Sequence, residues 1–407
     1  MNTLFEPIIL PNGTVIKNRF FKSAMNEAMG TRNLQPKKEV VNLYRQWAQG
    51  GAGLVVTGNV MVDPTSLAEP GNVVFNEQSD MTTLKEWAQA GRTNGTAIMV
   101  QINHSGKQAP KTVNKQPVAP SVVPIEGSMA NLFNAPRALS REEIKDLVQK
   151  FTTAAKVAKD AGFSGVQIHA AHGYLINQFL SPHDNRRTDE YGGNRDNRMR
   201  FLVEIYQGMR TACGADFPIG MKINSADFRE GGFSEEDSLY VIQEMENLGL
   251  DFIEISGGNY EKPTMSASTS KGKNKVFFAD YSKRLKNLVK IPVIVTGGIR
   301  SVESMVEVLE TNTADFIGLA RPMAIDPAIP NKIAEGSYET IETHHLSTGI
   351  KALDRKVASL LGIVYYQLLM HQYAKGKTPQ VTRNAWPSLL HALYTQGLAG
   401  LFPQRAK

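Results

Sequence analysis

The stretch Pro218-Ile219-Gly220-Met221-Lys222-Ile223-Asn224 is a short, mostly apolar run, and Ser234-Glu235-Glu236-Asp237 follows it closely. The first segment predicts a β-strand covered on both faces, because its apolar residues are consecutive and do not alternate with polar ones. The second predicts the start of a helix, since acidic residues favour the positive end of the helix dipole. Together the two segments form one strand–helix unit.

This unit recurs along the chain. The apolar runs that resemble strands are Arg19–Met25, Gly53–Gly58, Thr96–Ile102, Gly165–His169, Pro218–Asn224, Asp251–Ser256, Pro292–Thr296 and Ala314–Leu319. Helical stretches lie between them, one of which, Glu142–Lys159, begins with a capping box formed by Ser140 and Glu143. Eight such units predict an α/β fold, a (β/α)8 TIM barrel. A doubly wound sheet is the alternative, but nothing after Met25 resembles its glycine-rich phosphate turn.

Segments outside this rhythm predict additions to the barrel. Residues 8–16 contain an Asn-Gly turn and predict an N-terminal hairpin that closes the barrel floor. Leu353–Tyr373 and Pro387–Leu398 predict two helices after the last strand. We therefore divide the chain into a barrel domain, residues 1–340, and a C-terminal helical extension, residues 341–407. We expect the extension to pack against the barrel, with subunit pairing or contact with a membrane surface as alternatives.

Composition excludes several classes of protein. The chain has 407 residues, 42% of them apolar, and a net charge of +6 without a basic run that interleaves aromatics, so we expect no nucleic-acid partner. The single Cys213 excludes a disulfide framework and a four-thiolate cluster. The longest apolar stretch, Val357–Met370, is shorter than the roughly 20 residues that span a membrane. The first ten residues contain Glu6 and no basic residue, unlike the start of a signal peptide. We therefore expect a cytoplasmic protein.

Two long connections follow predicted strands, residues 103–139 and 170–195, and so lie on the catalytic face of a barrel. The second begins with His169-Ala170-Ala171-His172-Gly173-Tyr174. The two imidazoles can be structural, can bind a metal together with His183, Asp184 or Asp189, or can hold a substrate oxygen. In the third case Tyr174 is placed to donate a proton, because phenols keep theirs at neutral pH.

Other strand ends carry groups that suit a phosphorylated ring. Gly297-Gly298 and Ala320-Arg321 follow the seventh and eighth strands, where many barrels bind phosphate, although a simple turn with a surface arginine is the alternative. Lys222 lies in an apolar strand and can form a Schiff base, stabilise an anionic cofactor ring, or face solvent. The Gln101 amide can both donate to and accept from a ring edge. A phosphate clamp, a donor–acceptor amide and a cation together suit FMN.

At this point the chain resembles the Old Yellow Enzyme family, the flavin-dependent ene-reductases. The resemblance covers about residues 3–330 and is strongest between Gly165 and Arg198. The motifs that carry it are Leu10-Pro11-Asn12-Gly13, Lys17-Asn18-Arg19-Phe20, Ala24-Met25, Gly50-Gly51-Ala52-Gly53-Leu54-Val55-Val56-Thr57-Gly58, Gln101-Ile102-Asn103-His104-Ser105-Gly106, Val118-Ala119-Pro120-Ser121, His169-Ala170-Ala171-His172-Gly173-Tyr174-Leu175, Phe179-Leu180-Ser181-Pro182, Arg187-Thr188-Asp189-Glu190-Tyr191-Gly192-Gly193 and Asn197-Arg198.

The resemblance implies a role for each site residue. His169 and His172 would bind the carbonyl or nitro oxygen of an activated alkene. Tyr174 would protonate the alkene carbon. Lys222 would stabilise the reduced flavin. The residues that would line the flavin ring are Ala24, Met25, Asn26, Gly58 and Gln101, and those that would hold its phosphate are Gly298, Ala320 and Arg321. FMN would take electrons from NADH or NADPH and pass a hydride to the alkene; no metal is expected.

Some features depart from the family or stay open. Asn26 stands where relatives often carry Thr or Cys near a flavin oxygen, which leaves the flavin potential in doubt. The four cysteines of the longer iron–sulfur relatives are missing. Two other functions remain as alternatives, a Schiff-base lyase built on Lys222 and a flavin-holding binding protein. The oligomeric state is open, and a homo-oligomer is compatible with the sequence.

Overall fold

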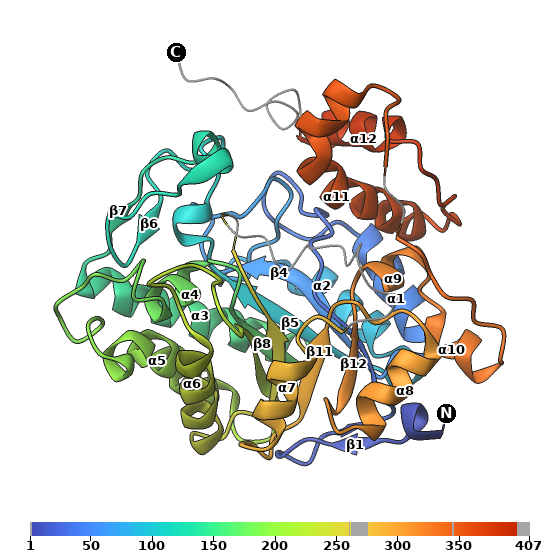
Figure 1. Cartoon of the computed structure of the whole chain (residues 1–407), viewed down its shortest axis with the longest axis horizontal. Helices are drawn as coiled ribbons and strands as arrows, with labels where there is room; N and C mark the ends of the chain where they lie inside the picture. The colour runs from blue at the N-terminus through green and yellow to red at the C-terminus, as the bar shows by residue number, and fades with distance from the viewer. Residues whose placement is uncertain (1, 260, 262–275, 344–345, 397–407) are drawn as a thin grey trace.

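A closed barrel of parallel strands forms the centre of the molecule (Figure 1). The computed structural model describes residues 2–259, 261, 276–343 and 346–396, and the barrel has eight strands within them. In order around the barrel they are β3 (Phe20–Lys22), β4 (Leu54–Met61), β5 (Ala97–Asn103), β8 (Gly165–Ala170), β9 (Ile219–Asn224), β10 (Phe252–Ser256), β11 (Val293–Thr296) and β12 (Phe316–Leu319), with β12 paired to β3. The predicted TIM barrel is confirmed, and each predicted apolar run overlaps one of these strands.

Helices follow the strands and cover the barrel from outside (Figure 1). They are α1 (Glu39–Gln49), α2 (Met81–Gly91), α3 (Arg141–Asp160), α4 (Leu175–Leu180), α5 (Arg195–Cys213), α6 (Glu235–Asn247), α7 (Ala279–Lys286), α8 (Val302–Glu310), α9 (Arg321–Ile325) and α10 (Ile329–Ala334). The capping box at the start of α3 is confirmed: the Glu143 backbone N–H donates to Ser140 Oγ at 3.2 Å, and the Ser140 N–H donates to Glu143 Oε2 at 2.9 Å. Ser234 and Asp237 form a second box at the start of α6.

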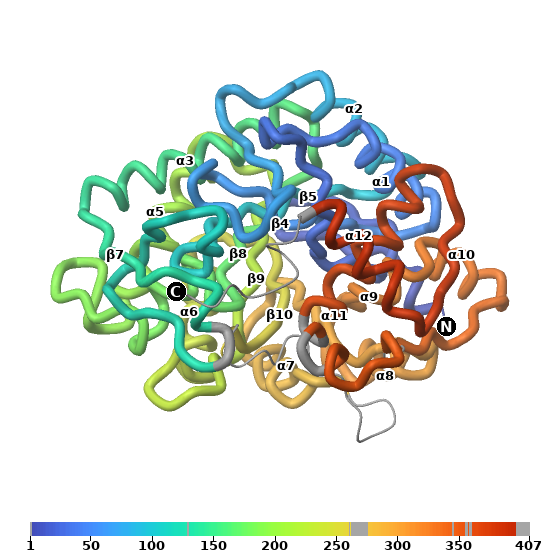
Figure 2. The backbone as a smooth tube through the Cα atoms, turned by 90° about the horizontal axis from the view of Figure 1, so that it is seen from above, coloured from blue at the N-terminus to red at the C-terminus, as the bar shows by residue number. Residues whose placement is uncertain are grey.

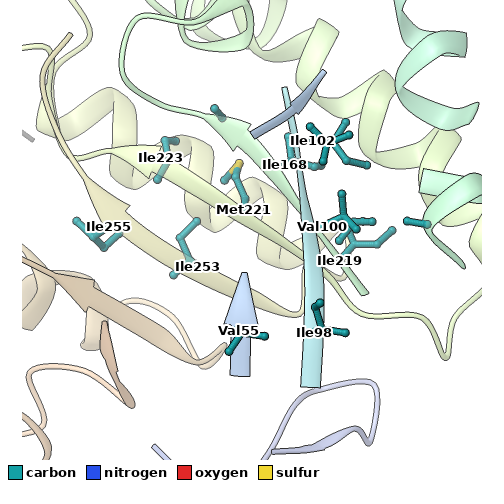
Figure 3. Close-up of a cluster of buried hydrophobic side chains, with 14 of the residues drawn as sticks. Val55, Ile98, Val100, Ile102, Ile168, Ile219, Met221, Ile223, Ile253 and Ile255 are labelled. Carbon is teal, nitrogen blue, oxygen red and sulfur yellow. The ribbon is translucent and has the colours of Figure 1, made fainter. Parts of the chain in front are cut away.

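Successive strand residues point in opposite directions, so each strand contributes to two layers. The outward-facing side chains include Val55, Ile98, Val100, Met221 and Ile253, which join the large core between barrel and helices (Figure 3). The inward-facing residues Leu54, Val56, Met99 and Phe252 belong to a separate apolar cluster. Because both faces are covered, the strands have the continuous apolar sequences from which the barrel was predicted.

The barrel floor is closed by the predicted N-terminal hairpin, β1 (Ile8–Ile9) and β2 (Val15–Ile16). Leu10 and Ile16 of this hairpin are almost fully buried against the inward-facing cluster. Gly220 is required in that layer, because a Cβ there would lie 2.1 Å from the ring of Phe252. The floor is therefore a packed apolar layer and not the opening of a channel.

The two long connections on the opposite face contain structure of their own. Residues 103–139 include η3 (Gly106–Gln108), η4 (Gly127–Leu132) and a small parallel pair, β6 (Val118–Ala119) with β7 (Arg137–Ala138). This pair was not predicted, because two-residue strands leave no periodicity to detect. The strand predicted to end at Gly58, β4, continues to Met61 past an irregular register between Val56 and Asn59.

The C-terminal extension contains α11 (Lys351–Ala374) and α12 (Trp386–Gln396). Both predicted helices are confirmed, although the end placed at Leu398 lies outside the described residues. α11 packs against α1, α9 and α12, so the expected packing against the barrel is also confirmed, and Figure 2 shows the extension above the side of the barrel formed by α1 and α9. None of the helices that the structure describes is both long and apolar enough to cross a membrane.

Candidate functional site

A cavity of about 230 Å³ lies at the C-terminal ends of the strands, the face where barrel enzymes carry their chemistry. The predicted site residues that line it are Ala24, His172, Lys222, Gly298, Ala320 and Arg321. The other predicted site residues, which are His169, Tyr174, Met25, Asn26, Gly58 and Gln101, lie at the same end of the barrel without lining this cavity. The cavity thus joins the ends of strands β9 to β12 with His172.

A network of hydrogen bonds crosses the barrel interior beneath the cavity. Glu254 is fully buried and accepts from Lys222 Nζ at 3.1 Å, Gln167 Nε2 at 2.9 Å and Thr296 Oγ1 at 2.9 Å. The Gln101 amide in turn donates to Gln167 Oε1 at 2.8 Å. Lys222 therefore has the partner that a buried cation requires, and Gln101 is held in one orientation.

The histidine pair lies against Lys222. The rings of His169 and His172 are 5.0 Å apart and nearly perpendicular, and His169 pairs with Lys222 in the register of β8 and β9. Burial, followed by the charge of Lys222, lowers the pKa of His169 well below its ordinary value; burial and His169 do the same for His172. Both imidazoles are thus neutral at neutral pH.

Local hydrogen bonds orient these rings. His169 Nδ1 accepts from the Ala171 backbone N–H at 3.3 Å, which leaves the proton of the neutral ring on Nε2. His172 Nε2 lies 2.6 Å from Ser256 Oγ, and the backbone N–H of His172 donates to Asn224 Oδ1 at 3.1 Å. His172 has a φ of +62°, a left-handed conformation that this contact stabilises.

Tyr174 completes the group. Its ring meets that of His169 edge to face at a centroid distance of 4.9 Å, and only 7% of the residue is exposed. The phenol packs in a small apolar cluster with Met61, Leu67 and Val74, from β4 and the loop after it. The structure brings the three predicted catalytic side chains together in one contiguous group.

The end of the cavity at β11 and β12 is rich in positive charge. Gly297 and Gly298 have φ of +121° and +85°, conformations that favour glycine, and Arg321 begins α9 beside them. Arg300 also lines the cavity, and burial together with the charge of Arg321 lowers its pKa. Arg300 was not among the predicted site residues, although it lies two positions after Gly298. Two adjacent guanidinium groups suit a doubly charged anion such as a phosphate.

The loop after β3 lies at the same end of the barrel, and Ala24 of this loop lines the cavity. Asn26 Oδ1 accepts from the Ala28 N–H at 2.9 Å, while its Nδ2 is buried and makes no hydrogen bond of normal geometry to any residue that the structure describes. Gly58 packs tightly there, because a Cβ would lie 2.2 Å from Glu27 Oε2, and its N–H donates to Glu27 Oε1 at 2.8 Å. Met25 packs against the large core.

The metal interpretation of the histidines finds no support in the geometry. Across the described ranges, no three His, Cys, Asp or Glu side chains are grouped so that they can hold a metal ion. His183 Nδ1 and Lys107 Nζ both bond to Asp184 Oδ1 at 2.9 Å, and Asp189 is paired with Arg187. The side chains considered as third ligands thus have other partners.

Comparison with known proteins identifies the arrangement. A family model described as the NADH:flavin oxidoreductase / NADH oxidase family matches residues 3–340. The chain belongs to this family. Its resemblance to the Old Yellow Enzymes is confirmed by the structure of an old yellow enzyme homologue from Zymomonas mobilis, which is 25% identical in sequence and has a TM-score of 0.72. The structural match covers 84% of this chain and 95% of the homologue.

Sequence relatives carry the same kind of name. NADH-dependent flavin oxidoreductases iliE from Neonectria sp. and Hypocrea jecorina are 36% and 34% identical and each covers 80% of this chain. The match spans 46% of the Neonectria protein and 88% of the Hypocrea protein, so the matched region covers less than half of one relative and most of the other.

Membership of this NADH:flavin oxidoreductase family makes FMN the cofactor and a nicotinamide nucleotide the electron donor. The residues present fit FMN. Arg300 and Arg321 lie together where a phosphate needs cations, and Lys222 provides a buried positive charge in the same cavity.

Proposed function

We propose that the chain is an FMN-dependent ene-reductase, which uses NADH or NADPH to reduce the C=C bond of α,β-unsaturated carbonyl or nitro compounds. The observation that carries this proposal is the contiguous group of His169, His172 and Tyr174 beside Lys222. Two neutral donors and one phenol, grouped beside the cavity, suit an acceptor that has an oxygen to bind and a carbon to protonate.

In this proposal different residues at the C-terminal ends of the strands hold the phosphate and the ring of FMN. Gly298, Ala320 and Arg321, with Arg300 added, hold the phosphate. The residues that line the ring are Ala24, Met25, Asn26, Gly58 and Gln101. Lys222 stabilises negative charge on the ring, and Glu254 fixes its position. Bound FMN supplies the hydride chemistry.

The histidines bind and polarise the acceptor. Because the proton of His169 resides on Nε2, that atom can donate to a carbonyl or nitro oxygen. Neutral imidazoles do so without placing a full positive charge beside Lys222, which is what their lowered pKa values favour. Withdrawal of electron density by this bond makes the β-carbon of the alkene more reactive toward hydride.

Tyr174 supplies the proton that completes the reduction. Its ring is in edge-to-face contact with His169, the residue that would bind the oxygen, and its apolar surroundings would exclude water that competes as a proton source.

The test is Tyr174→Phe. We expect alkene reduction to slow by about 10²–10⁴-fold, the usual contribution of general acid catalysis, whereas reduction of the flavin by NADH should persist. Anaerobic stopped-flow absorbance separates the two half-reactions. Tyr240→Phe, on the outer helix α6, is the matched control. Equal losses in both half-reactions would show that Tyr174 is not the proton donor.

The alternatives predict different spectra. A Schiff-base lyase would need Lys222 as an unprotonated amine. The Glu254 carboxylate lies 3.1 Å from Lys222 Nζ, and this contact favours an ammonium group. A lyase would be colourless and would form a borohydride-trapped adduct at Lys222, and a flavin-holding protein would be coloured but not bleached by NADH. An ene-reductase would bleach with NADH or NADPH and recover its colour when a cyclic enone is added.

A further inference from the structure

The C-terminal extension, residues 341–407, differs in charge from the rest of the chain. It contains eight Lys or Arg residues and two acidic residues, whereas residues 1–340 contain equal numbers of basic and acidic residues. The net charge of +6 on the whole chain is therefore the charge of the extension. Because the family model matches residues 3–340, this charge lies outside the part of the chain that the model covers.

One side of the extension packs against the barrel. Helix α11 contacts α1 and α9, and two hydrogen bonds fix it there. Gln367 Nε2 donates to Glu69 Oε2 at 2.9 Å, in the loop after β4, and Tyr373 donates to the Ile325 oxygen at 2.7 Å, at the end of α9. Helix α12 packs in turn on α11. Figure 1 places α12 at the end of the molecule opposite the hairpin that closes the floor, which is the active-site end.

Helix α12 is apolar on the side that faces solvent. Leu390 is 63% exposed and Tyr394 is 91% exposed, while Trp386 and Leu393 are 44% and 36% exposed. These positions are three or four residues apart, so they form one stripe along the helix. Ala392, on the opposite side, is fully buried. Polar residues normally occupy the solvent side of such a helix, and the apolar stripe therefore indicates a contact surface.

Cations without acidic partners lie in the segment that leads into this helix. Lys375 and Lys377 follow α11, and Arg383 comes three residues before α12; all three are exposed. Within the described ranges, none of these three side chains takes part in an ion pair. They are therefore available to anionic groups from outside the protein.

An anionic bilayer matches both features. Its interface accepts Trp, Tyr and Leu side chains from a helix that lies in its plane, and its headgroups attract Lys and Arg. A second copy of the chain is disfavoured, since both extensions would bring the same positive charge. An acidic protein would meet the charge, but it would also need a groove for α12, whereas a bilayer accepts an outward-facing helix as it stands.

We propose that the C-terminal extension docks the protein on the surface of an anionic phospholipid bilayer. The stripe of α12 lies among the headgroups, and Lys375, Lys377 and Arg383 contact the lipid phosphates. Because α12 stands at the active-site end of the molecule, this contact holds that end of the barrel on the side of the bilayer (Figure 1). Such docking is independent of the proposed ene-reductase reaction.

The test is sedimentation of the FMN-loaded full chain with sucrose-filled vesicles. The vesicles consist of phosphatidylcholine alone, or of phosphatidylcholine with a quarter of phosphatidylserine. Wild-type protein should bind the second kind about a hundredfold more tightly, because each Lys or Arg near an anionic surface contributes about fivefold to affinity. The difference should shrink as salt is added. Equal binding to both kinds of vesicle, or binding to neither, would overturn the proposal.

The contribution of the stripe is tested with the double variant Leu390→Ser, Tyr394→Ser. Both side chains are largely exposed, so the fold should be retained. Binding to the phosphatidylserine vesicles should weaken by at least about tenfold, because apolar area no longer enters the interface. The matched control is Ile9→Ser with Val15→Ser, two residues of the floor hairpin that are 66% and 61% exposed. Equal losses in the two double variants would show that α12 is not the contact.

The contribution of the cations is tested with Lys375→Gln, Lys377→Gln and Arg383→Gln combined. The preference for phosphatidylserine should fall about a hundredfold, to near that of uncharged vesicles. The matched control lowers the net charge equally, at exposed positions of the barrel, by Lys85→Gln, Lys115→Gln and Lys145→Gln. Equal losses in the two triple variants would mean that net charge alone drives binding, which would refute a docking site on the extension.

Measurements without lipid distinguish the other occupants of the stripe. Sedimentation velocity of the protein alone reports self-association, and polyglutamate represents an acidic protein segment. A dimer that dissociates in the Leu390→Ser, Tyr394→Ser variant would place a second copy on α12. Polyglutamate binding that is as tight as vesicle binding, and equally weakened in this variant, would indicate an acidic protein. Either result would overturn the bilayer proposal, and the absence of both supports it.

Discussion

The barrel interior contains two adjacent layers of opposite character. The floor consists of apolar side chains, among them Ile16, Phe21, Met99 and Phe252. The layer above it is the network around Glu254, in which each polar side chain has a partner inside the barrel. The floor gains stability from burial and packing, which are non-directional, whereas the network fixes positions and charge. The comparison indicates that stability and chemistry can be changed separately in this protein.

The largest effect is expected from the floor. Phe252→Ala should lower the free energy of unfolding by about 3–5 kcal/mol, because it leaves a cavity in a closed layer. The loss should be the same at every pH, since the residues of this cluster carry no titratable group. Urea denaturation at pH 7 and 5 measures it. A lower FMN affinity in the folded variant would show that floor and site are not independent.

A pH-dependent loss of similar size should arise at the active-site end. Burial lowers the pKa of His104, which follows β5, to about 4. Between pH 6.5 and 4 the unfolded chain takes up a proton that the folded chain cannot, so the free energy of unfolding should fall by up to about 3 kcal/mol on this account.

His104→Asn tests this expectation, because the asparagine oxygen can still accept from the Gly106 N–H that His104 Nδ1 binds at 3.1 Å. The variant should lose less stability than the wild type between pH 7 and 4.5, as measured by urea denaturation. Parallel losses in both proteins would mean that His104 does not govern the response.

A smaller effect on stability, with a larger effect on chemistry, is expected from Glu254→Gln. The variant retains the shape but loses a charge-assisted hydrogen bond, at a cost of about 1.5–3 kcal/mol. Lys222 would then be an uncompensated cation, and the midpoint potential of bound FMN should become more positive. Glu335→Gln, on the exposed end of α10, is the control. An unchanged potential would place Lys222 away from the flavin.

The sequence predicted the barrel well because burial on both faces leaves a direct trace. Runs such as Pro218–Asn224 are continuously apolar, and Ser140 with Glu143 marks a helix start through local hydrogen bonds alone. The division at residue 340 remains a prediction, as do the roles given to the site residues. The candidate catalytic group was predicted through a resemblance, since contacts between three side chains cannot be derived from their spacing.

What the sequence did not reveal depends on contacts between distant segments. Lys222 was expected to need a partner, but Glu254 could be identified only once β9 and β10 were known to be neighbours in register. Gln367 and Glu69 are 298 positions apart in the chain. No local pattern distinguishes a glutamine that bonds to an active-site loop from one that faces solvent.

The closure of the barrel has a consequence for biosynthesis. β3 pairs only with β4 and β12, and the partner of Phe20 in β12 is Ile317. At 5–20 residues per second, a ribosome needs roughly 15–60 s to travel from one to the other. During that interval one edge of β3, with its two phenylalanines, has no strand to pair with. We expect the nascent chain to depend on a holding chaperone until translation has passed β12.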